Sequence, residues 1–324
     1  MFSKIMVPTD GSGFDRKAIL VALRVAERCD AKVLLVRVLS TGAYLGIEAA
    51  TDGLASVNAL RAEHTAALSE LNALAAECRN ISDAEISVDL EEGPAADVLE
   101  RYARRNDIDL IVISSHGRRG VARLSLGSVT DSLIKGTTIP VLVVKPNASY
   151  LTPEVSKTFH HIIVPLDGSA LAERILSRVV PLAKLEDAEI TLLHVLSSSD
   201  DWYEDEEGRR PPWWEKRVAG AKAYLSHRAS EVRLQGIAAT IEVVVGDKVA
   251  EAITDYARRQ GADLIAIATH GRGGLARVVR GSVADAVVKS AMSSILVFHP
   301  AKAIDNRLAE DSVENSREEA ATPA

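Results

Sequence analysis

The sequence has few cysteines and lacks a long hydrophobic run. Cys29 ends one helical pattern and Cys78 continues the apolar stripe of another, so we expect both to be buried as small hydrophobic residues and not joined in a disulfide framework. No apolar run approaches the roughly 20 residues that a membrane span needs. The N-terminus has no extended apolar stretch followed by a cleavage site. These absences predict a cytoplasmic protein without a membrane span.

An excess of positive charge is also absent. The chain carries 38 Lys and Arg against 45 Asp and Glu, which gives a net charge of −7. A general nucleic-acid-binding protein needs a basic surface to engage phosphates, so we expect no nucleic-acid partner. The hydrophobic share of 47% is ordinary for a globular protein, and 324 residues are enough for two domains that each bury a core.

Several common functional motifs are missing. The phosphate-binding pattern Gly-x-x-x-x-Gly-Lys-Ser/Thr does not occur, and Gly11-Ser12-Gly13 lacks the third glycine of the dinucleotide fingerprint. No cluster of His, Cys, Asp and Glu has metal-ligand spacing. We therefore predict no metal site and no catalytic residue.

What the sequence does contain is a domain-sized repeat. Val-Pro-x-Asp-Gly-Ser follows the first apolar run, and a similar segment recurs with Asp167 in place of Asp10, at an offset of 157 residues. A glycine-containing stretch at 114–128 recurs at 268–282, at an offset of 154. A period of this length indicates duplication of a whole domain and not a solenoid of short repeats.

Apolar runs and helical patterns alternate within each copy. In the first half we expect strands at 4–8, 32–39, 86–90, 109–113 and 140–144, and helices at 16–28, 54–78, 95–106 and 129–135. In the second half we expect strands at 162–165, 190–196, 241–245, 263–268 and 294–298, and helices at 171–184, 218–234, 249–260 and from 283 onward.

Continuously apolar strands that alternate with helices are typical of a parallel sheet covered on both faces. We therefore predict an α/β fold with two tandem, doubly wound, five-stranded parallel-sheet domains of Rossmann-like type. The expected domains are 1–146 and 158–301, joined by a linker at 147–157 and followed by a disordered acidic tail at 302–324.

Ligands of such sheets bind beyond the carboxyl ends of the strands, near the point where the strand order reverses. Asp10 and Asp167 each follow the first strand of their half. Either carboxylate could accept hydrogen bonds from ribose hydroxyls or hold Mg²⁺, and either could simply cap a helix or close a turn.

The repeated glycine stretch lies between the fourth strand and a helix N-terminus, which is a favourable place for an anion. Nine residues separate Gly117 from Gly127-Ser128, and the same number separate Gly271 from Gly281-Ser282. A flexible linker with two turn glycines is the alternative. Positive charge around such a site is supplied by Arg118, Arg119, Arg123, Arg272, Arg277 and Arg280, although for any one of these arginines a place on the solvated surface is favoured over contact with a ligand. His116 and His270 could act as bases, although no partner nucleophile has informative spacing, so a role in placing the backbone is favoured.

An acidic insertion at 200–214 contains all three tryptophans, Trp202, Trp213 and Trp214. We expect a solvated loop, and we hypothesise that it covers the mouth of the second-half site or contacts a partner.

These motifs resemble those of the universal stress protein family, in particular its tandem two-domain members. The family's nucleotide motif is Gly-x-x-Gly-x9-Gly-Ser/Thr. The chain matches three of its positions in each half, whereas Ser114 and Ala268 replace the first glycine. Both replacements are small enough to leave room for a nucleotide, although each adds a Cβ.

The resemblance implies ATP binding on an adenine nucleotide alpha hydrolase-like fold, with Mg²⁺ as a possible companion. The implied contacts of the first half are Pro8, Thr9, Asp10, Val38, Ile113, Ser114, Gly117, Gly127, Ser128 and Val129. Those of the second half are Pro165, Asp167, Val195, Ile267, Ala268, Gly271, Gly281, Ser282 and Val283. In each half, adenine and ribose would lie against the aspartate that follows the first strand and the valine near the end of the second strand. The phosphates would lie over the glycine stretch.

The resemblance also implies pairing of the last strands, 141–144 and 295–298, within one chain as a pseudo-dimer, with a homodimer as a further option. The favoured function is that of an ATP-binding stress protein whose nucleotide state regulates an unknown protein partner without robust catalysis. A slow Mg²⁺-dependent ATPase and a nucleotide-free interaction module are the alternatives.

Overall fold

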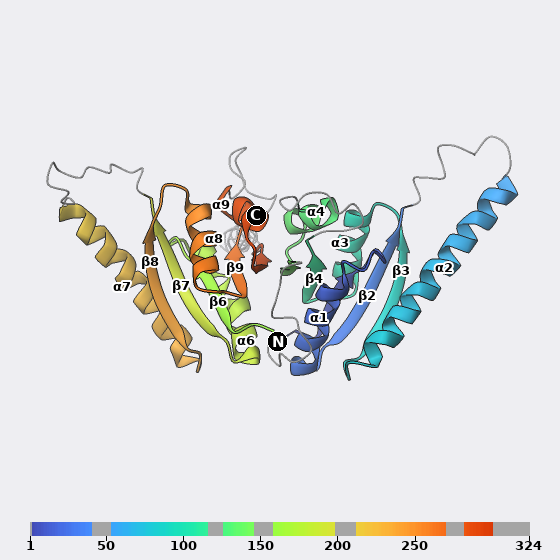
Figure 1. The fold of residues 1–324 in the computed structure, drawn as a ribbon, viewed down its shortest axis with the longest axis horizontal. Coiled ribbons are helices and arrows are strands. Elements are labelled where there is room, and N and C mark those ends of the chain that lie inside the picture. Colours follow the sequence, from blue (N-terminus) through green and yellow to red (C-terminus); the bar gives the residue numbers. More distant parts are fainter. Residues whose placement is uncertain are drawn as a thin grey trace, which may run out of the picture.

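Ten strands from the two halves form one continuous sheet in the computed structural model, which describes residues 2–40, 53–115, 126–145, 158–197, 212–269 and 282–300 (Figure 1). The side chains of 53–57, 212 and 282 are outside this description. The strand order is β3-β2-β1-β4-β5-β10-β9-β6-β7-β8. Within each half all strand pairs are parallel, which confirms the predicted fold class of two tandem doubly wound sheets.

The strands follow the apolar runs of the sequence closely. They are β1 (Lys4–Pro8), β2 (Lys32–Leu39), β3 (Ile86–Glu92), β4 (Leu110–Ser114), β5 (Val141–Val144), β6 (His161–Pro165), β7 (Glu189–Leu196), β8 (Ala239–Val245), β9 (Leu264–Ala268) and β10 (Ser294–Phe298). The central strands are buried on both faces, as the unbroken runs in β4, β5 and β10 require. The outermost strands, β3 and β8, alternate between covered and exposed positions.

Helices cover both faces of the sheet. They are α1 (Arg16–Cys29), α2 (Gly53–Arg79), α3 (Ala95–Arg105), α4 (Ser128–Gly136), α5 (Ala170–Glu173), α6 (Leu176–Glu186), α7 (Pro212–Leu234), α8 (Val249–Arg259) and α9 (Ser282–Ser290). One core lies between the sheet and α1, α2, α6 and α7, and the other between the sheet and α3, α4, α8 and α9. Each core includes residues of both halves. No helix in the described ranges is long and apolar enough to cross a membrane.

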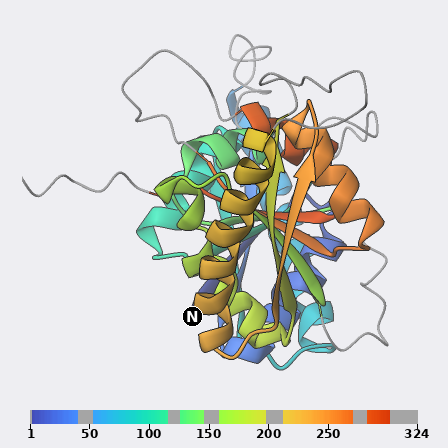
Figure 2. The same cartoon turned by 90° about the vertical axis from the view of Figure 1, so that its left-hand side faces the viewer.

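The views show how these layers are arranged. Figure 1 places α4 and α9 above the centre of the sheet and α1 and α6 below it, with α2 and α7 along the two outer ends. Figure 2 shows α7 lying lengthwise over the outer strands of its half, where it contacts β8 and β7. The two halves are thus related as copies about an axis through the middle of the sheet.

The first helix of the second half differs from the predicted single helix at 171–184. It is divided into α5 and α6 at Arg174 and Ile175. The N–H groups of these two residues donate to carbonyls three positions back, at Leu171 and Ala172. The chain therefore has 3₁₀-type hydrogen bonds here in place of α-helical ones. Apolar periodicity continues across the break, which explains why the sequence pattern did not locate it.

Helix α7 begins at Pro212, six residues before the predicted start at Val218. Trp214 is buried at 4% exposure and packs with Leu196 and Ala221. It therefore extends the apolar stripe of the helix by one more turn. Trp213 lies beside it, with the two rings edge to face at 6.0 Å, and is 42% exposed. Trp214 thus anchors the helix on the sheet, and the part of the insertion at 200–211 lies outside the described residues.

Both cysteines are packed among apolar residues, as expected. Cys78 is 3% exposed and belongs to the core beneath α2, and Cys29 is half-buried with its Sγ donating to the Val25 carbonyl. Burial raises the pKa of both thiols. They are therefore held in the thiol form at neutral pH.

The halves meet at an antiparallel seam between β5 and β10. Leu142 lies opposite Leu296, with Val141 opposite Val297 and Val143 opposite Ile295. The pairing expected between these strands is confirmed. Below the sheet, Arg28 of α1 donates to the Leu185 carbonyl of α6 at 3.0 Å and lies 3.8 Å from the buried carboxylate of Glu186.

Lys145, which follows β5, is buried beside this seam. Its Nζ donates to the Val288 carbonyl at 2.8 Å, and burial lowers its pKa from the ordinary 10.5 to about 8. Between pH 8 and 10.5 the unfolded chain binds the Lys145 proton more strongly than the folded chain, so stability rises with pH in that window.

We therefore expect the unfolding free energy of the wild type to rise relative to that of Lys145→Met by up to about 3 kcal/mol between pH 8 and 10.5. Urea denaturation at several pH values measures this difference. Lys289→Met, which removes a half-exposed lysine of α9, is the control and should run parallel to the wild type. Parallel curves for all three proteins would contradict the depressed pKa.

Candidate functional site

The strand order reverses between β1 and β4 in the first half and between β6 and β9 in the second. Ile5 and Met6 pair with Leu110 and Ile111, and Ile162 and Ile163 pair with Leu264 and Ile265. The same registers place the carboxyl ends of β1 and β4 next to each other, and likewise those of β6 and β9. The segments singled out in the sequence, with Asp10 and Ser114 or with Asp167 and Ala268, thus meet at equivalent switch points.

The loop after β1 is organised by its own side chains. Asp10 Oδ1 accepts a hydrogen bond from the Ser12 N–H at 2.9 Å, which closes an Asx turn, and Gly11 has φ of +73°. Thr9, buried at 6% exposure, donates its hydroxyl to the buried carboxylate of Asp15 and its N–H to the Val36 carbonyl. Asp10 therefore closes a turn and does not cap α1, whose N-cap is Asp15.

The loop after β6 repeats this arrangement. Asp167 Oδ1 accepts from the Ser169 N–H at 2.9 Å, and Ser169 caps α5 by accepting from the Ala172 N–H. Burial opposes ionisation of Asp167, but the hydrogen bonds from Ser169 and the charge of nearby His194 outweigh it and hold the pKa below its usual range. An ionised carboxylate at this position can accept hydrogen bonds from hydroxyl groups of a ligand.

Sequence reasoning missed the residues that brace these two loops from β2 and β7. Arg37 lies under the Asp10 loop: a Cβ on Gly11 would come within 3.2 Å of its guanidinium, which also pairs with Glu70 at 2.6 Å. His194, its counterpart in the repeat, has Nδ1 2.8 Å from the Leu166 carbonyl. Arg37 and His194 each follow an apolar run and precede the valine that is expected to contact adenine. Only the pairing of β2 with β1 and of β7 with β6 shows that these two side chains contact the loops after β1 and β6.

A further polar cluster supports the second loop. Tyr224 of α7 donates its hydroxyl to Glu173 of α5 at 2.9 Å, and its ring lies edge to face with His194 at 6.4 Å. Burial and this hydrogen bond raise the pKa of Tyr224. Arg228 lies 3.6 Å from the same Glu173 carboxylate. The cluster joins α5 and α7 behind Asp167.

The two ends of the first glycine stretch are tied together. The Gly127 N–H donates to the Ser115 carbonyl at 2.9 Å, and the Thr130 hydroxyl donates to the Ser114 carbonyl at 3.0 Å. These bonds bring the start of α4 over the end of β4. The first-turn N–H groups of a helix have no intrahelical acceptors, so this end of α4 presents donors to an anion.

An apolar wall lies on the same face as α4. Val38, Ile113 and Val129 belong to the core between the sheet and α3 and α4. Their counterparts Val195, Ile267 and Val283 belong to the corresponding core region of the second half. Each switch point thus combines a carboxylate, a partly buried apolar surface and a helix N-terminus.

The structure describes only some of the other candidate residues. Pro8 is buried and Pro165 half-buried at the ends of their strands, and Ser128 opens α4 as Ser282 opens α9. Other candidates lie outside the described residues, namely Gly117, Gly271, Gly281, His116, His270 and the six arginines. So do the expected linker and the expected tail. In the described part of the chain, no group of three His, Cys, Asp or Glu residues could hold a metal ion.

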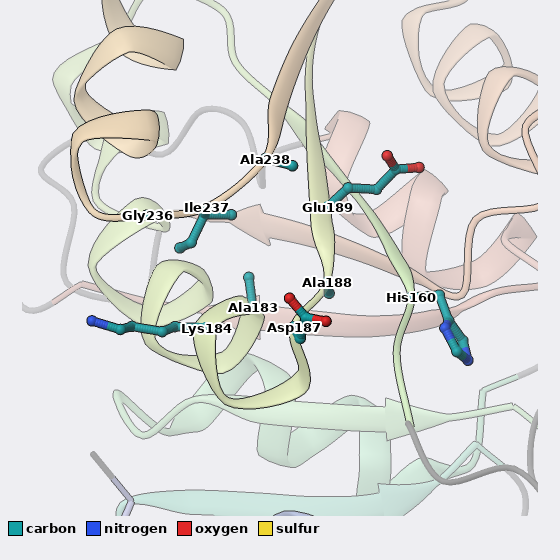
Figure 3. Close-up of a pocket in the computed structure, with 9 residues that line it drawn as sticks. All are labelled: His160, Ala183, Lys184, Asp187, Ala188, Glu189, Gly236, Ile237 and Ala238. Carbon is teal, nitrogen blue, oxygen red and sulfur yellow. The ribbon is translucent and has the colours of Figure 1, made fainter.

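A cavity of about 340 Å³ lies at the opposite edge, at the amino ends of β6, β7 and β8. It is bordered by Lys184, Asp187, Glu189 and His160, with Gly236 to Ala238 on the far side. Figure 3 shows the Lys184 and His160 side chains pointing away from its centre in different directions. These groups do not converge on a common point, and the cavity is remote from both switch points, so we assign the site to the carboxyl ends of the strands.

The fold and its two equivalent switch points define a tandem doubly wound α/β protein. The profile of the universal stress protein family matches residues 1–145 and 158–299, and the chain belongs to this family.

Relatives and solved structures agree with this assignment. A universal stress protein of Methanocaldococcus jannaschii is 32% identical over 145 residues, which are 45% of this chain and 83% of that protein. One from Mycobacterium tuberculosis is 28% identical over 196 residues, 59% of this chain and 62% of that protein, so the match spans about three fifths of the mycobacterial relative.

Two solved structures show the same fold over nearly the whole chain. A universal stress protein from Archaeoglobus fulgidus has a TM-score of 0.67 at 17% identity, covering 92% of this chain and 98% of that one. A functionally unknown protein from Pseudomonas aeruginosa has a TM-score of 0.63 at 18% identity, covering 98% of both chains.

Proposed function

We propose that the chain binds one ATP at each of its two switch points, and that its nucleotide state regulates a protein partner during stress without robust catalysis. The observation that carries the proposal is a carboxylate loop at both places where the strand order reverses, with the N-terminus of α4 tied over the end of β4 in the first half. We further propose the domain limits 1–146 and 158–301 and a cytoplasmic location, where ATP is abundant.

The groups present suit the parts of ATP. Asp10 and Asp167 offer carboxylate oxygens to ribose hydroxyls, and Val38 and Val195 offer apolar surface to adenine. The N-termini of α4 and α9 suit phosphates. Mg²⁺, if it accompanies ATP, would supply charge neutralisation at the phosphates.

The acidic residues near these helix ends do not oppose the proposal. Asp131 of α4 forms an ion pair with Lys135, and Asp285 of α9 pairs with Lys289 at 2.7 Å. Each negative charge in the first turn therefore has a positive neighbour four residues on, which limits its repulsion of a phosphate.

The proposal predicts that gently purified protein, once denatured, releases about two ATP per chain. Two equivalents would support both sites, and one would indicate that one half has lost binding. Isothermal titration of nucleotide-free protein with ATP and Mg²⁺, with release of phosphate followed in the same sample, separates a binding protein from a slow ATPase. Absence of both co-purified nucleotide and a thermal shift with ATP would overturn the proposal.

A further inference from the structure

The two halves brace their switch points differently. Lys145 and His299 occupy equivalent positions in the repeat, at the offset of 154, because each directly follows the strand that forms the seam. Both are buried, at 8% and 4% exposure. His299 hydrogen-bonds the hydroxyl of Thr269, the residue after β9, and Lys145 crosses the seam to α9. Both basic residues therefore contact the second half.

The contact of Lys145 is made at the end of α9 that lies away from the switch point. Carbonyls in the last turn of a helix lack intrahelical donors. The Val287 carbonyl receives the Ala291 N–H at 2.9 Å, and the Val288 carbonyl receives Lys145 Nζ at 2.8 Å. The Lys145 N–H also lies 3.4 Å from the Ser294 hydroxyl at the start of β10. A positive group at this end also interacts favourably with the helix dipole.

The helix that Lys145 caps is the one that opens the second switch point. Helix α9 has nine residues, and Ala284, Val287 and Val288 anchor it in the core that runs across both halves. A helix this short moves as one piece, so a change at its last turn displaces its first turn. In the first half, the corresponding helix α4 ends with the equivalent backbone bond, from the Thr137 N–H to the Leu133 carbonyl, whereas His299, the counterpart of Lys145, bonds Thr269 of its own half.

We propose that Lys145 is a positioning residue for the second ATP site. It caps α9 from across the seam and thereby couples this site to the pairing of the two halves. This inference rests on the proposed function. It makes the two sites inequivalent: the second depends on a residue of the other half. By thermodynamic reciprocity, ATP at the second site strengthens the contact of Lys145 with α9.

The test measures ATP affinity at one site at a time in the full chain. Gly117→Val isolates the second site and Gly271→Val isolates the first. With Lys145→Met added, we expect ATP affinity to fall about fivefold or more at the second site and to change less than about twofold at the first. Lys145→Arg, which keeps a charged donor, should recover part of the loss. Ser290→Ala, on the same helix, removes an exposed hydroxyl that donates to the Ala286 carbonyl within α9 and should leave both affinities unchanged.

Each other outcome overturns a specific statement. A wild type that binds no ATP overturns the proposed function and this inference together. A wild type that binds two ATP, with Lys145→Met unchanged at the second site or equally weakened at both, overturns the inference alone. If Lys145→Met does not fold, hydrogen exchange decides on the Gly117→Val protein: ATP should slow amide exchange in the last turn of α9 and in β5, and unchanged exchange in both contradicts the coupling.

Discussion

Leu142→Ala and Leu296→Ala should each lower the free energy of unfolding by about 2 to 5 kcal/mol. The two leucines lie directly opposite each other in the seam, and each is fully buried. Truncation of either removes apolar contacts at the centre of the core that joins the halves and leaves a cavity that neither β5 nor β10 can close by shifting, because each is paired on both sides.

Urea denaturation followed by circular dichroism measures these losses. Leu234→Ala, at an 88% exposed leucine at the end of α7, is the matched control and should change stability by less than about 0.5 kcal/mol. Because Leu142 and Leu296 lie directly opposite each other, the loss of unfolding free energy in the double variant should differ from the sum of the two single losses. Single seam variants as stable as Leu234→Ala would show that β5 and β10 are not paired in solution.

Gly117→Val and Gly271→Val should each reduce the bound ATP from two per chain to one, and the double variant should bind none. The proposed function places a nucleotide phosphate close to the backbone at these glycines, and a β-branched side chain would occupy that space. Isothermal titration gives the stoichiometry and affinity, and we expect at least a hundredfold loss at the altered site.

The control is Gly220→Val on α7, where a Cβ would have no atom within 4 Å. Valine is also a better helix residue than glycine, so this variant should fold and bind two ATP. Two ATP bound to both single variants at wild-type affinity would mean that the repeated glycine stretch is a linker between strand and helix.

Most of the sheet could be predicted from the sequence because its signal is local. Unbroken apolar runs such as Val141–Val144 identify strands that are buried on both faces, and β1, β2 and β10 begin and end where the runs do. The internal repeat then supplied the equivalence of the two switch points. The fold class and the neighbourhood of Asp10 and Ser114 followed from these patterns without any knowledge of long-range contacts.

The contacts that brace the site could not be predicted in the same way. Arg37 has the appearance of a charged residue at the end of a strand, and its position under Gly11 depends on the pairing of β1 with β2. Lys145 follows an apolar strand into a polar segment, which usually indicates exposure. Its burial is caused by α9, a helix more than 130 residues away in sequence. Such effects arise only when the whole sheet is assembled.

The seam also determines how the protein responds to dilution. Strands β5 and β10 are covalently connected through the chain between them, so their association is intramolecular and its equilibrium does not depend on protein concentration. Two separate chains joined through the same edge would come apart at low concentration, whereas here the inner edges stay paired. The ten-stranded sheet then ends at β3 and β8, whose exposed acidic side chains, Glu92 and Glu242 among them, discourage pairing with the edge of another chain.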